Sequence, residues 1–336
     1  MAASLIRRRD IVFAGGAAAA CGILPLGAAA QQHDRVRRLG VLLNLAEDDP
    51  ETRARLAAFL QVLKDKGWNE GRNLRLDYRW GLGDLDQHRK HVADLIARGV
   101  DLFFVHGSGI MRQLVRVSRT VPVVFVSVAD PVAMGFVASL ARPGGNMTGF
   151  TSIEYAIGGK WLELLKQIAP RVTRVAVIRD VEAVSAGGQI GAIQAVAHVL
   201  GIEVSLLDLR ETVEFENAIG AFARQPNGGL IVTTTALAQI HRTQLIGLAA
   251  KHRLPAVYPY RIFAKAGGLF AYGPDIIDQY RQAASYVDLV LKGAKPAELP
   301  VRQPTKFEMT INLKTAKSLA LEIPTALLTS ADEVIE

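Results

Sequence analysis

Short apolar runs rich in branched residues alternate with longer segments of helical period along most of this chain. The runs lie at 39–43, 74–78, 102–105, 123–128 and 147–150, and again at 175–178, 204–207, 230–233, 256–258 and 269–272. Between runs, apolar residues recur at i, i+3, i+4 and i+7, as at Leu56, Phe59, Leu60 and Leu63. Continuous apolar runs suit strands of a parallel sheet that is covered on both faces. The alternation therefore predicts right-handed βαβ crossovers and a doubly wound α/β fold.

The alternation pauses once, at residues 142–146, and then starts again. Chains of about 300 residues exceed the size at which a single hydrophobic core usually keeps growing. We therefore expect two parallel-sheet lobes joined by a hinge, an N-terminal lobe of residues 35–149 with part of 274–336 and a C-terminal lobe of residues 150–273. The trailing chain contains a long helix at 275–291 and a last strand near 309–313. We expect it to cross back onto the first lobe.

The first thirty residues have the pattern of an export signal. Arg8 and Arg9 precede an apolar stretch from Ile11 to Leu26, and Ala28-Ala29-Ala30 provides a small-residue exit. A membrane-spanning helix needs about 18 or more consecutive apolar residues, whereas this stretch is interrupted by glycines and by Pro25. We predict a signal peptide at residues 1–30, a twin-arginine export route and a periplasmic location.

Cys21 is the only cysteine of the chain, and it lies within the predicted leader. Cleavage after Ala30 leaves a mature protein that has neither a disulfide nor thiolate chemistry. An alternative is processing before Cys21, which would leave a lipid-anchored N-terminus.

The charge of the chain is only mildly basic. Removal of residues 1–30 removes three arginines and one aspartate, so the formal charge falls from +7 to +5. Lysines and arginines are scattered among acidic residues, without a long basic run or interleaved aromatics. We therefore expect no nucleic-acid partner.

Ligands of open parallel sheets bind beyond the carboxyl ends of the strands. The residues at or just after the predicted strands include small hydroxyls, an amide, a glycine, a carboxylate, an arginine and tyrosines. This combination suits a small zwitterionic or polar ligand that also has an apolar part. The predicted ligand-binding residues are Asn44, Gly107, Ser108, Ser127, Asp130, Arg179, Thr234, Tyr258 and Tyr272.

Several of these residues have a structural interpretation beside the functional one. Asp130 precedes Pro131, so it either caps a helix or binds a ligand ammonium group. Ser108 either caps a helix beginning near Met111 or lies where free helix amides bind a carboxylate. The tyrosines either belong to the core or cover the apolar part of a ligand.

Signatures of enzymes are missing from the predicted strand ends. The first strand leads into Asn-Leu-Ala-Glu-Asp, without the spaced glycines of a dinucleotide site. Ser108 is not part of a G-x-S-x-G motif, and Gly158-Gly159-Lys160 lacks the upstream glycine of a P-loop. His88 and His91, at i, i+3 on a charged helix face, are more typical of a surface than of a metal site. We expect no catalysis, no cofactor and no metal site.

Several segments together resemble a known family. They are Arg-Leu-Gly-Val-Leu-Leu at 38–43, Gly-Trp-Asn-Glu-Gly-Arg-Asn at 67–73, Pro-Val-Val-Phe at 122–125 with Asp-Pro-Val at 130–132, Ser-Leu-Ala-Arg-Pro-Gly-Gly-Asn-Met-Thr-Gly at 139–149, Leu-Glu-Leu-Leu-Lys at 162–166 and Ile-Asn-Leu-Lys-Thr-Ala-Lys at 311–317. In these segments the chain resembles the substrate-binding proteins of ABC transporters, in the tryptophan/tyrosine-type branch with a type I periplasmic-binding fold.

The resemblance implies a protein, expected as a monomer, that closes two lobes on a small polar or aromatic solute such as an amino acid. It implies delivery of the solute to an ABC permease in the membrane, with Ser108 and Asp130 at family-like pocket positions. Members often carry an Asn-Pro pair where this chain has Arg179-Asp180-Val181, so the identity of the ligand does not transfer.

Two alternative functions remain open at this point. One is an exported enzyme of doubly wound fold, which the twin-arginine pattern favours because that route carries folded, cofactor-containing proteins. The other is a ligand sensor for a membrane receptor, which would use the same cleft with a different partner.

Overall fold

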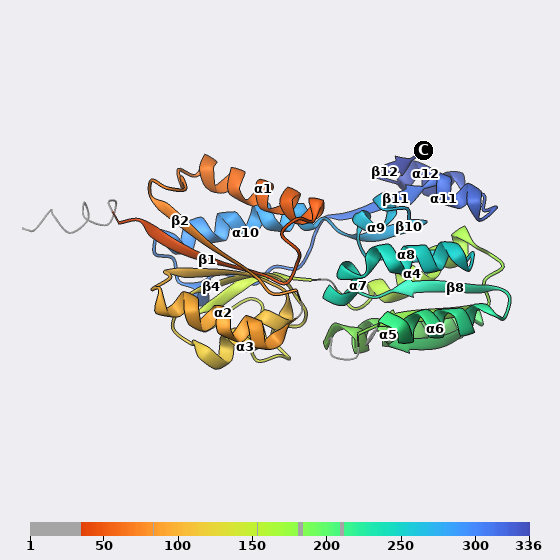
Figure 1. Cartoon of the computed structure of the whole chain (residues 1–336), viewed down its shortest axis with the longest axis horizontal. Helices are drawn as coiled ribbons and strands as arrows, with labels where there is room; N and C mark the ends of the chain where they lie inside the picture. The colour runs from red at the N-terminus through yellow and green to blue at the C-terminus, as the bar shows by residue number, and fades with distance from the viewer. Residues whose placement is uncertain (1–34, 83, 153, 181–183, 209–211) are drawn as a thin grey trace, which may run out of the picture. The chain divides into compact units, whose positions relative to one another are not determined.

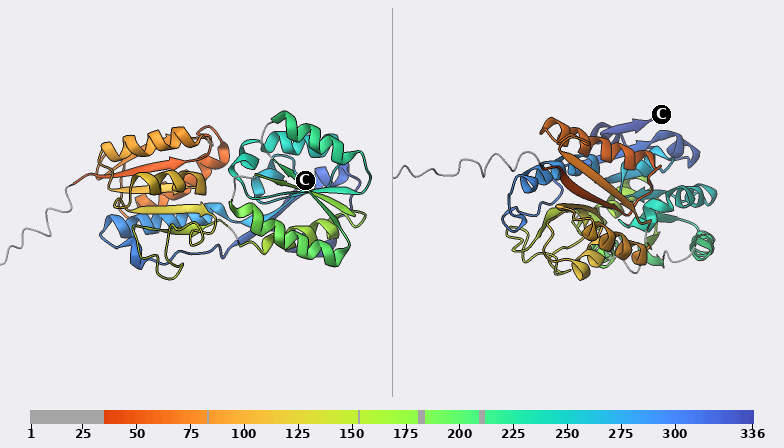
Figure 2. Two further views of the ribbon diagram at one scale, coloured as in Figure 1. Left: turned by 90° about the horizontal axis from the view of Figure 1, so that it is seen from below. Right: turned by 60° about the vertical axis from the view of Figure 1, so that its left-hand side comes forward.

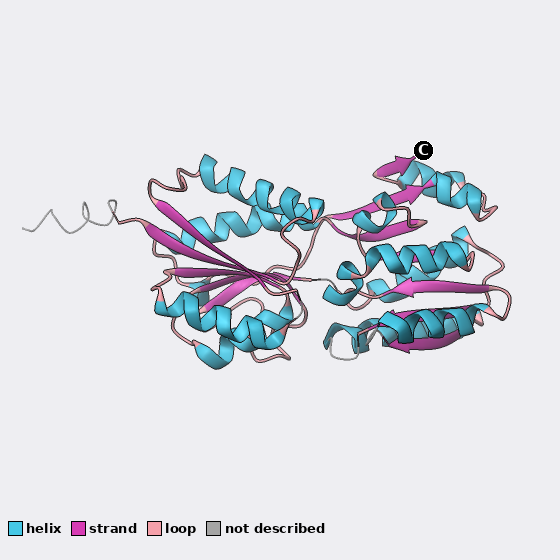
Figure 3. Ribbon diagram, viewed as in Figure 1, coloured by secondary structure: helices cyan, strands magenta, loops and turns pink. Residues whose placement is uncertain are grey.

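The computed structural model describes residues 35–82, 84–152, 154–180, 184–208 and 212–336. Residues Val36–Glu336 form one compact unit, which contains two β-sheets with their helices (Figures 1 and 3). The signal peptide predicted for residues 1–30, with the twin-arginine assignment and the Cys21 alternative, lies outside the described residues.

The first sheet has five parallel strands in the order β2-β1-β3-β4-β5. They are β1 (Arg37–Leu43), β2 (Leu74–Trp80), β3 (Leu102–His106), β4 (Val123–Val128) and β5 (Met147–Thr151). Every residue of β3 and β5 is buried, as continuous apolar runs require when helices cover both faces of a sheet. The order is that of a doubly wound sheet, because the chain moves from β1 to one edge and then returns past β1 to the other.

Four helices cover the first sheet, and the sheet together with these helices is called the first lobe. They are α1 (Pro50–Asp65), α2 (Leu85–Ala97), α3 (Ser108–Val117) and α10 (Ile276–Leu291). α1 and α10 pack together on one face, where Phe59 stacks on Phe104 at 4.3 Å and Tyr280 meets both rings edge-on. α2 and α3 pack together on the opposite face (Figure 1), where Val92 and Ile110 are fully buried.

The second sheet has seven strands in the order β12-β11-β10-β9-β8-β6-β7. They are β6 (Arg174–Arg179), β7 (Glu203–Asp208), β8 (Gly228–Val232), β9 (Ala256–Tyr258), β10 (Phe270–Pro274), β11 (Phe307–Asn312) and β12 (Glu333–Ile335). Neighbouring strands are parallel except for β10 and β11, which are antiparallel. The single antiparallel pair arises because β11 enters the sheet after the chain has returned from the first lobe.

The second sheet and the helices of its own segment are called the second lobe, and helices lie on both faces of each sheet (Figure 2). The helices are α4 (Ile157–Ile168), α5 (Val184–Leu200), α6 (Thr212–Ala223), α7 (Ala236–Ile240), α8 (Arg242–Lys251), α9 (Arg261–Lys265), α11 (Leu313–Ser318) and α12 (Thr325–Ser330). Trp161 of α4 is fully buried in the apolar core of this lobe, and its Nε1 donates to the backbone oxygen of Tyr272 over 2.7 Å.

The chain passes between the two sheets three times, after β5, after β10 and before β11. After β10, Asp275 caps α10 by accepting from the backbone N of Asp278 over 2.9 Å. A 3-10 turn, η1 (Pro296–Glu298), follows α10. The chain then lies against β5, where Arg302 N donates to Gly149 O over 2.9 Å, before it enters β11. Of the trailing chain, α10 packs on the first lobe, but the last strand predicted to cross back with it is β11, which pairs with β10 in the second sheet. The residue boundaries predicted for the two lobes stay a prediction.

Candidate functional site

Three predicted site residues lie where β1 and β3 end. Asn44 follows β1 and is 7% exposed, and its Oδ1 is 3.1 Å from Nε2 of buried His88. Gly107 has a φ of 95°, which glycine adopts without a Cβ penalty. The Oγ of Ser108 accepts a hydrogen bond from the backbone N of Ala129 over 3.0 Å. Ser108 therefore joins the start of α3 to the loop that follows β4.

The structure shows that the capping interpretation of Ser108 is wrong. α3 begins at Ser108 itself rather than near Met111, its N-cap is Gly107, and no side chain caps it. The first amides of a helix lack partners within the helix and lie at the positive end of its dipole. The start of α3 is therefore suited to an anionic group.

Ser127 and Asp130 lie at the end of β4 in unusual backbone conformations. Their φ angles are 54° and 35°, in the left-handed region of backbone conformation that residues other than glycine rarely adopt. Asp130 Oδ1 accepts from the backbone N of Ala133 over 3.0 Å, but the residues after Asp130 form a turn rather than the helix that the capping interpretation requires. Its Oδ2 accepts from the hydroxyl of Tyr155 over 3.4 Å. Burial, with the charge of Asp130, raises the pKa of Tyr155. Such local strain is concentrated at functional sites.

Four buried polar atoms near the ends of β4 and β5 have no hydrogen-bond partner among the described residues. They are Ser127 Oγ, Thr151 Oγ1, Ser152 Oγ and Gln279 Oε1. Gln279 of α10 donates from Nε2 to Thr151 O over 3.0 Å, and Ser152 N donates to Val128 O over 2.9 Å. A buried polar group without a partner is costly. This edge of the first sheet can therefore hydrogen-bond a polar ligand.

The two polar residues predicted in the second lobe are engaged with protein groups. Arg179 Nε donates to Asp208 Oδ1 over 2.6 Å, from neighbouring strand ends that lie in register. Thr234 is 7% exposed, and its backbone N donates to Gln189 Oε1 over 3.2 Å.

The two predicted tyrosines pack within the second lobe. Tyr258 is 1% exposed and stacks on Phe263, with ring centroids 5.0 Å apart. Tyr272 is partly buried and stacks on Phe307 at 5.9 Å. Burial raises the pKa of the Tyr258 hydroxyl. The ring of Tyr258 can cover a ligand only if it leaves this stack.

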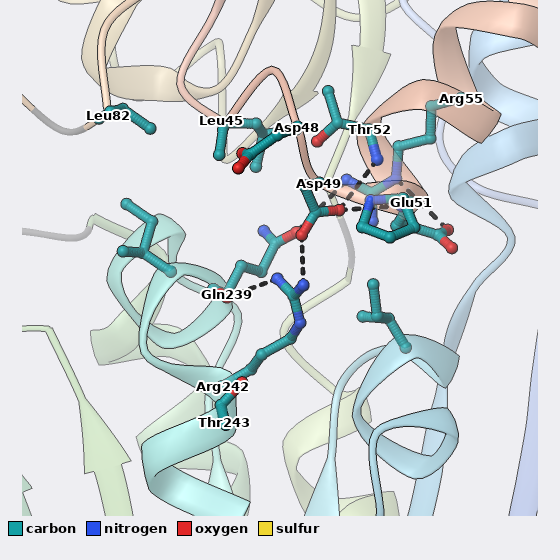
Figure 4. Close-up of a pocket in the computed structure, with 14 residues that line it drawn as sticks. Leu45, Asp48, Asp49, Glu51, Thr52, Arg55, Leu82, Gln239, Arg242 and Thr243 are labelled. Atoms are coloured by element: carbon teal, nitrogen blue, oxygen red, sulfur yellow. Dashed lines mark hydrogen bonds and ion pairs between the residues drawn. The ribbon is translucent and has the colours of Figure 1, made fainter.

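A pocket of about 300 Å³ lies between the start of α1 and helices α7, α8 and α9 (Figure 4). Its lining residues are Leu45, Ala46, Asp48, Asp49, Pro50, Glu51, Thr52, Arg55, Leu82, Gln239, Ile240, Arg242, Thr243 and Ile262. None of the nine predicted site residues is in this set. One of its lining residues, Leu45, nevertheless directly follows the predicted site residue Asn44 in the sequence.

Polar contacts cross this pocket from the first lobe to the second. Asp49 Oδ1 caps α1 by accepting from the backbone N of Glu51 over 2.9 Å, while Asp49 Oδ2 forms an ion pair with Arg242 of α8. Arg55 is 2% exposed and donates from Nη1 to Gln239 Oε1 over 3.3 Å. Figure 4 shows Asp49 facing Arg242 across the pocket.

Arg261 of α9 extends this set of charges toward the chain crossings. Its Nη2 lies 3.8 Å from Glu51 Oε1 of the first lobe, and its Nη1 lies 3.3 Å from Glu308 Oε2 of β11. Burial raises the pKa of Glu308 to about 7, although the charge of Arg261 acts in the opposite direction. Near Glu308, Lys306 Nζ forms an ion pair with Asp275 Oδ2 over 2.8 Å.

Sequence reasoning missed several of these residues. Thr151 and Ser152 directly follow the predicted strand at 147–150, so the search at strand ends would have found them if extended by two positions. Gln279 and Arg55 lie inside helical segments, where a pattern of apolar residues carries no signal for a buried polar side chain.

Within the described part of the chain, no group of three or more His, Cys, Asp or Glu side chains is arranged to hold a metal ion. In the same part, no helix has the length and apolar character needed to cross a bilayer.

The two sheets and their helices define a two-lobed α/β protein with doubly wound architecture. Residues 45–335 match the family model described as ABC transporter substrate binding protein. The chain belongs to this family.

The chain is similar to a tyrosine-binding protein from Clostridioides difficile (strain R20291), with 24% identity over 270 residues that cover 79% of this chain and 76% of the relative. It is similar in fold to an ABC domain in complex with L-Trp from Streptococcus pneumonia, with a TM-score of 0.82, 22% identity, and coverage of 89% of this chain and 99% of the other. The ligand-free, open structure of a substrate-binding protein from Clostridium difficile gives a TM-score of 0.66, at 22% identity and the same coverages.

Proposed function

We propose that this protein is the exported solute-binding component of an ABC importer, and that its solute is an aromatic amino acid. It closes its two lobes on the ligand, delivers the ligand to a membrane permease and catalyses no reaction. Family membership supports a small-molecule ligand and a permease partner. The tyrosine-binding relative and the relative solved with L-Trp support the choice of ligand.

The observation that carries the proposal is the set of hydrogen-bonding groups at the edge of the first sheet. Asp130 and the unpartnered Gln279 Oε1 accept hydrogen bonds, and the hydroxyl of Ser127 can accept or donate. The amides at the start of α3 attract an anion. Together these groups complement the ammonium and the carboxylate of an amino acid. In this proposal Ser108 and Asp130 hold the polar head of the ligand.

The second lobe closes over the rest of the ligand. Tyr272 provides aromatic surface for its apolar part, and Tyr258 adds to that surface once its ring leaves the stack on Phe263. Thr234 and the paired Arg179 border the site from the strand ends. Asn44 and Gly107 complete the first-lobe side.

The proposal includes export. The basic start and the Ala28-Ala29-Ala30 exit support a signal peptide at residues 1–30, and Arg8-Arg9 supports the twin-arginine route to the periplasm. The mature protein acts as a monomer and has no nucleic-acid partner.

Calorimetric titration of the full chain with L-tyrosine and L-tryptophan tests the ligand. We expect saturable binding of one of them and no chemical change in the recovered ligand. Asp130→Asn keeps an oxygen that can accept from Ala133 N but removes the charge that faces the ligand ammonium, so affinity should fall by about tenfold or more.

Asp65→Asn, on the exposed end of α1, is the matched control and should leave affinity unchanged. Equal affinities of wild type and Asp130→Asn would overturn the role of Asp130. Failure of every amino acid to bind would overturn the ligand class.

A further inference from the structure

Three polar contacts join the N-terminal end of α1 to the second lobe. We propose that these contacts form a latch, and that this latch sets ligand affinity by stabilising the closed arrangement of the lobes without contacting the ligand. The α1 latch consists of Asp49, Glu51 and Arg55 on the first lobe, with Arg242, Arg261 and Gln239 on the second. The inference rests on the proposed function, because it requires lobes that open and close around a solute.

Each first-lobe member of the α1 latch faces its own partner across the lobes. Asp49 pairs with Arg242, Glu51 with Arg261 at 3.8 Å, and Arg55 with Gln239 at 3.3 Å. Because the partners belong to different lobes, separation of the lobes breaks all three contacts at once. The contacts therefore stabilise the closed state and contribute nothing to the open state.

Burial shields these contacts from water and salt more than ordinary surface ion pairs are shielded. The side chains of Asp49 and Glu51 are 10% and 12% exposed, and Arg55 as a residue is 2% exposed. Exposed ion pairs contribute little, because water and salt screen them and because long side chains lose entropy when they are held. The pair between Lys251 and Glu216, with side chains 63% and 48% exposed within the second lobe, illustrates the weak kind.

The latch is fixed in position by the local structure of α1. The carboxylate of Asp49 also accepts from the backbone N of Glu51 and Thr52, so capping holds it in one orientation. Glu51 and Arg55 are i, i+4 neighbours, with Oε1 and Nε 3.5 Å apart. These first-lobe side chains are already held in place, so they lose little conformational entropy when the lobes close.

The latch acts on affinity through the population of the closed state. A ligand that binds the closed state has an apparent dissociation constant equal to the intrinsic one divided by the closed fraction. Loss of a latch contact lowers this fraction and weakens binding of any ligand by the same factor.

A double-mutant cycle on the first contact tests the proposal in the full chain. Asp49→Asn keeps an oxygen for the cap of α1 but removes the charge, and Arg242→Gln removes the partner. Each single variant should weaken binding of L-tyrosine or L-tryptophan by about five- to tenfold, and the double variant should be no weaker than either. Lys251→Gln on the same helix as Arg242 is the control and should bind like wild type.

A second measurement needs no ligand. In full chain carrying Cys21→Ser, spin labels at Lys90→Cys on α2 and Val199→Cys on α5 report the distance between the lobes, since both positions are exposed. Without ligand, Arg242→Gln and Asp49→Asn should each shift the distance distribution away from the closed arrangement, whereas Lys251→Gln should not.

The results separate the two proposals. If neither amino acid binds but the latch variants still shift the distances, the latch stands and the proposed ligand is wrong. If the distances of the latch variants equal those of wild type, or if the effects of Asp49→Asn and Arg242→Gln on affinity simply add, the latch is overturned even when the amino acid binds.

Discussion

His106 shows how burial of a single residue couples the fold to pH. It ends β3, its Nδ1 lies 2.9 Å from the hydroxyl of Tyr280, and burial lowers its pKa to about 3, with the charge of Arg55 acting in the same direction. Burial likewise lowers the pKa of His88 to about 4. Both imidazoles are therefore neutral in the folded protein at pH values where they would be charged in the unfolded chain.

The first prediction follows from the sign of this shift. Because the folded pKa lies below the ordinary value of about 6.5, the unfolded state binds the proton first, and stability falls as pH drops from 6.5 toward 3. His106→Gln removes the titrating group, so its free energy of unfolding should fall less steeply than that of wild type over this range. Urea unfolding at several pH values measures both slopes.

His198→Gln, on the exposed face of α5, serves as the control and should leave the wild-type slope unchanged. Parallel curves for wild type and His106→Gln would show that His106 does not contribute to acid sensitivity.

At the scale of residues, the positions of candidate site groups could be predicted but their contacts could not. The location of Asn44 and Ser127 at strand ends could be predicted because parallel strands present their carboxyl ends along one edge. The pairing of Arg179 with Asp208 depends on the register between β6 and β7, which are separated by a whole helix. A local pattern carries no information on such a register.

At the scale of elements, the packing of β5 against β4 explains why the segment Ala-Arg-Pro-Gly-Gly-Asn-Met-Thr-Gly ends in a glycine, Gly149. It lies in the middle of β5 with a φ of 151°. A Cβ at this position would lie 2.0 Å from the backbone oxygen of Phe125 in neighbouring β4. The close approach of the two strands therefore requires glycine.

The second prediction is that Gly149→Ala destabilises the protein by about 3 kcal/mol or more, because the added carbon meets backbone that cannot move aside. Gly145→Ala in the same segment is the matched control, since a Cβ there has nothing within 4 Å, and it should change stability by less than about 1 kcal/mol. Thermal and urea unfolding compare the two. Equal effects would mean that β5 can shift to admit a side chain.

Long elements were predicted from the sequence, while several of the short ones were not. The predicted helix at 275–291 is α10, which begins one residue later because Asp275 is its cap. The five-residue helices α7 and α9 and the three-residue strand β12 are too short to show a period. α7 contains Gln239 and α9 contains Arg261, two of the second-lobe residues of the α1 latch. Because these helices were not predicted, the latch could not be predicted either.

At the scale of the molecule, alternation of strands and helices predicted two α/β lobes, while contacts between lobes depended on the folded arrangement. The latch partners Arg55 and Gln239 are 184 positions apart. Glu308 shows the same dependence. It lies in β11, directly after the third chain crossing, and the crossing places it near Arg261 of α9 and Glu51 of α1.

The last prediction concerns the pH response of this crossing. Burial raises the pKa of Glu308 to about 7; Arg261 lowers it, and Asp275, Glu51 and Asp332 raise it. Because the folded pKa exceeds the ordinary value, the folded state holds the proton longer than the unfolded chain does. The resulting stability is complete below about pH 4.5 and is lost as pH rises through 7.

Glu308→Gln keeps the shape of the side chain and removes the titrating carboxyl group, while Arg261 keeps its ion pair with Glu51. The free energy of unfolding of the variant should therefore decline less than that of wild type between pH 5 and 8, in the opposite pH direction to the effect of His106→Gln. Glu298→Gln, in the exposed turn η1, controls for loss of a carboxylate elsewhere. A wild-type slope in Glu308→Gln would mean that Glu308 is already ionised at pH 5 and that its burial is offset by Arg261.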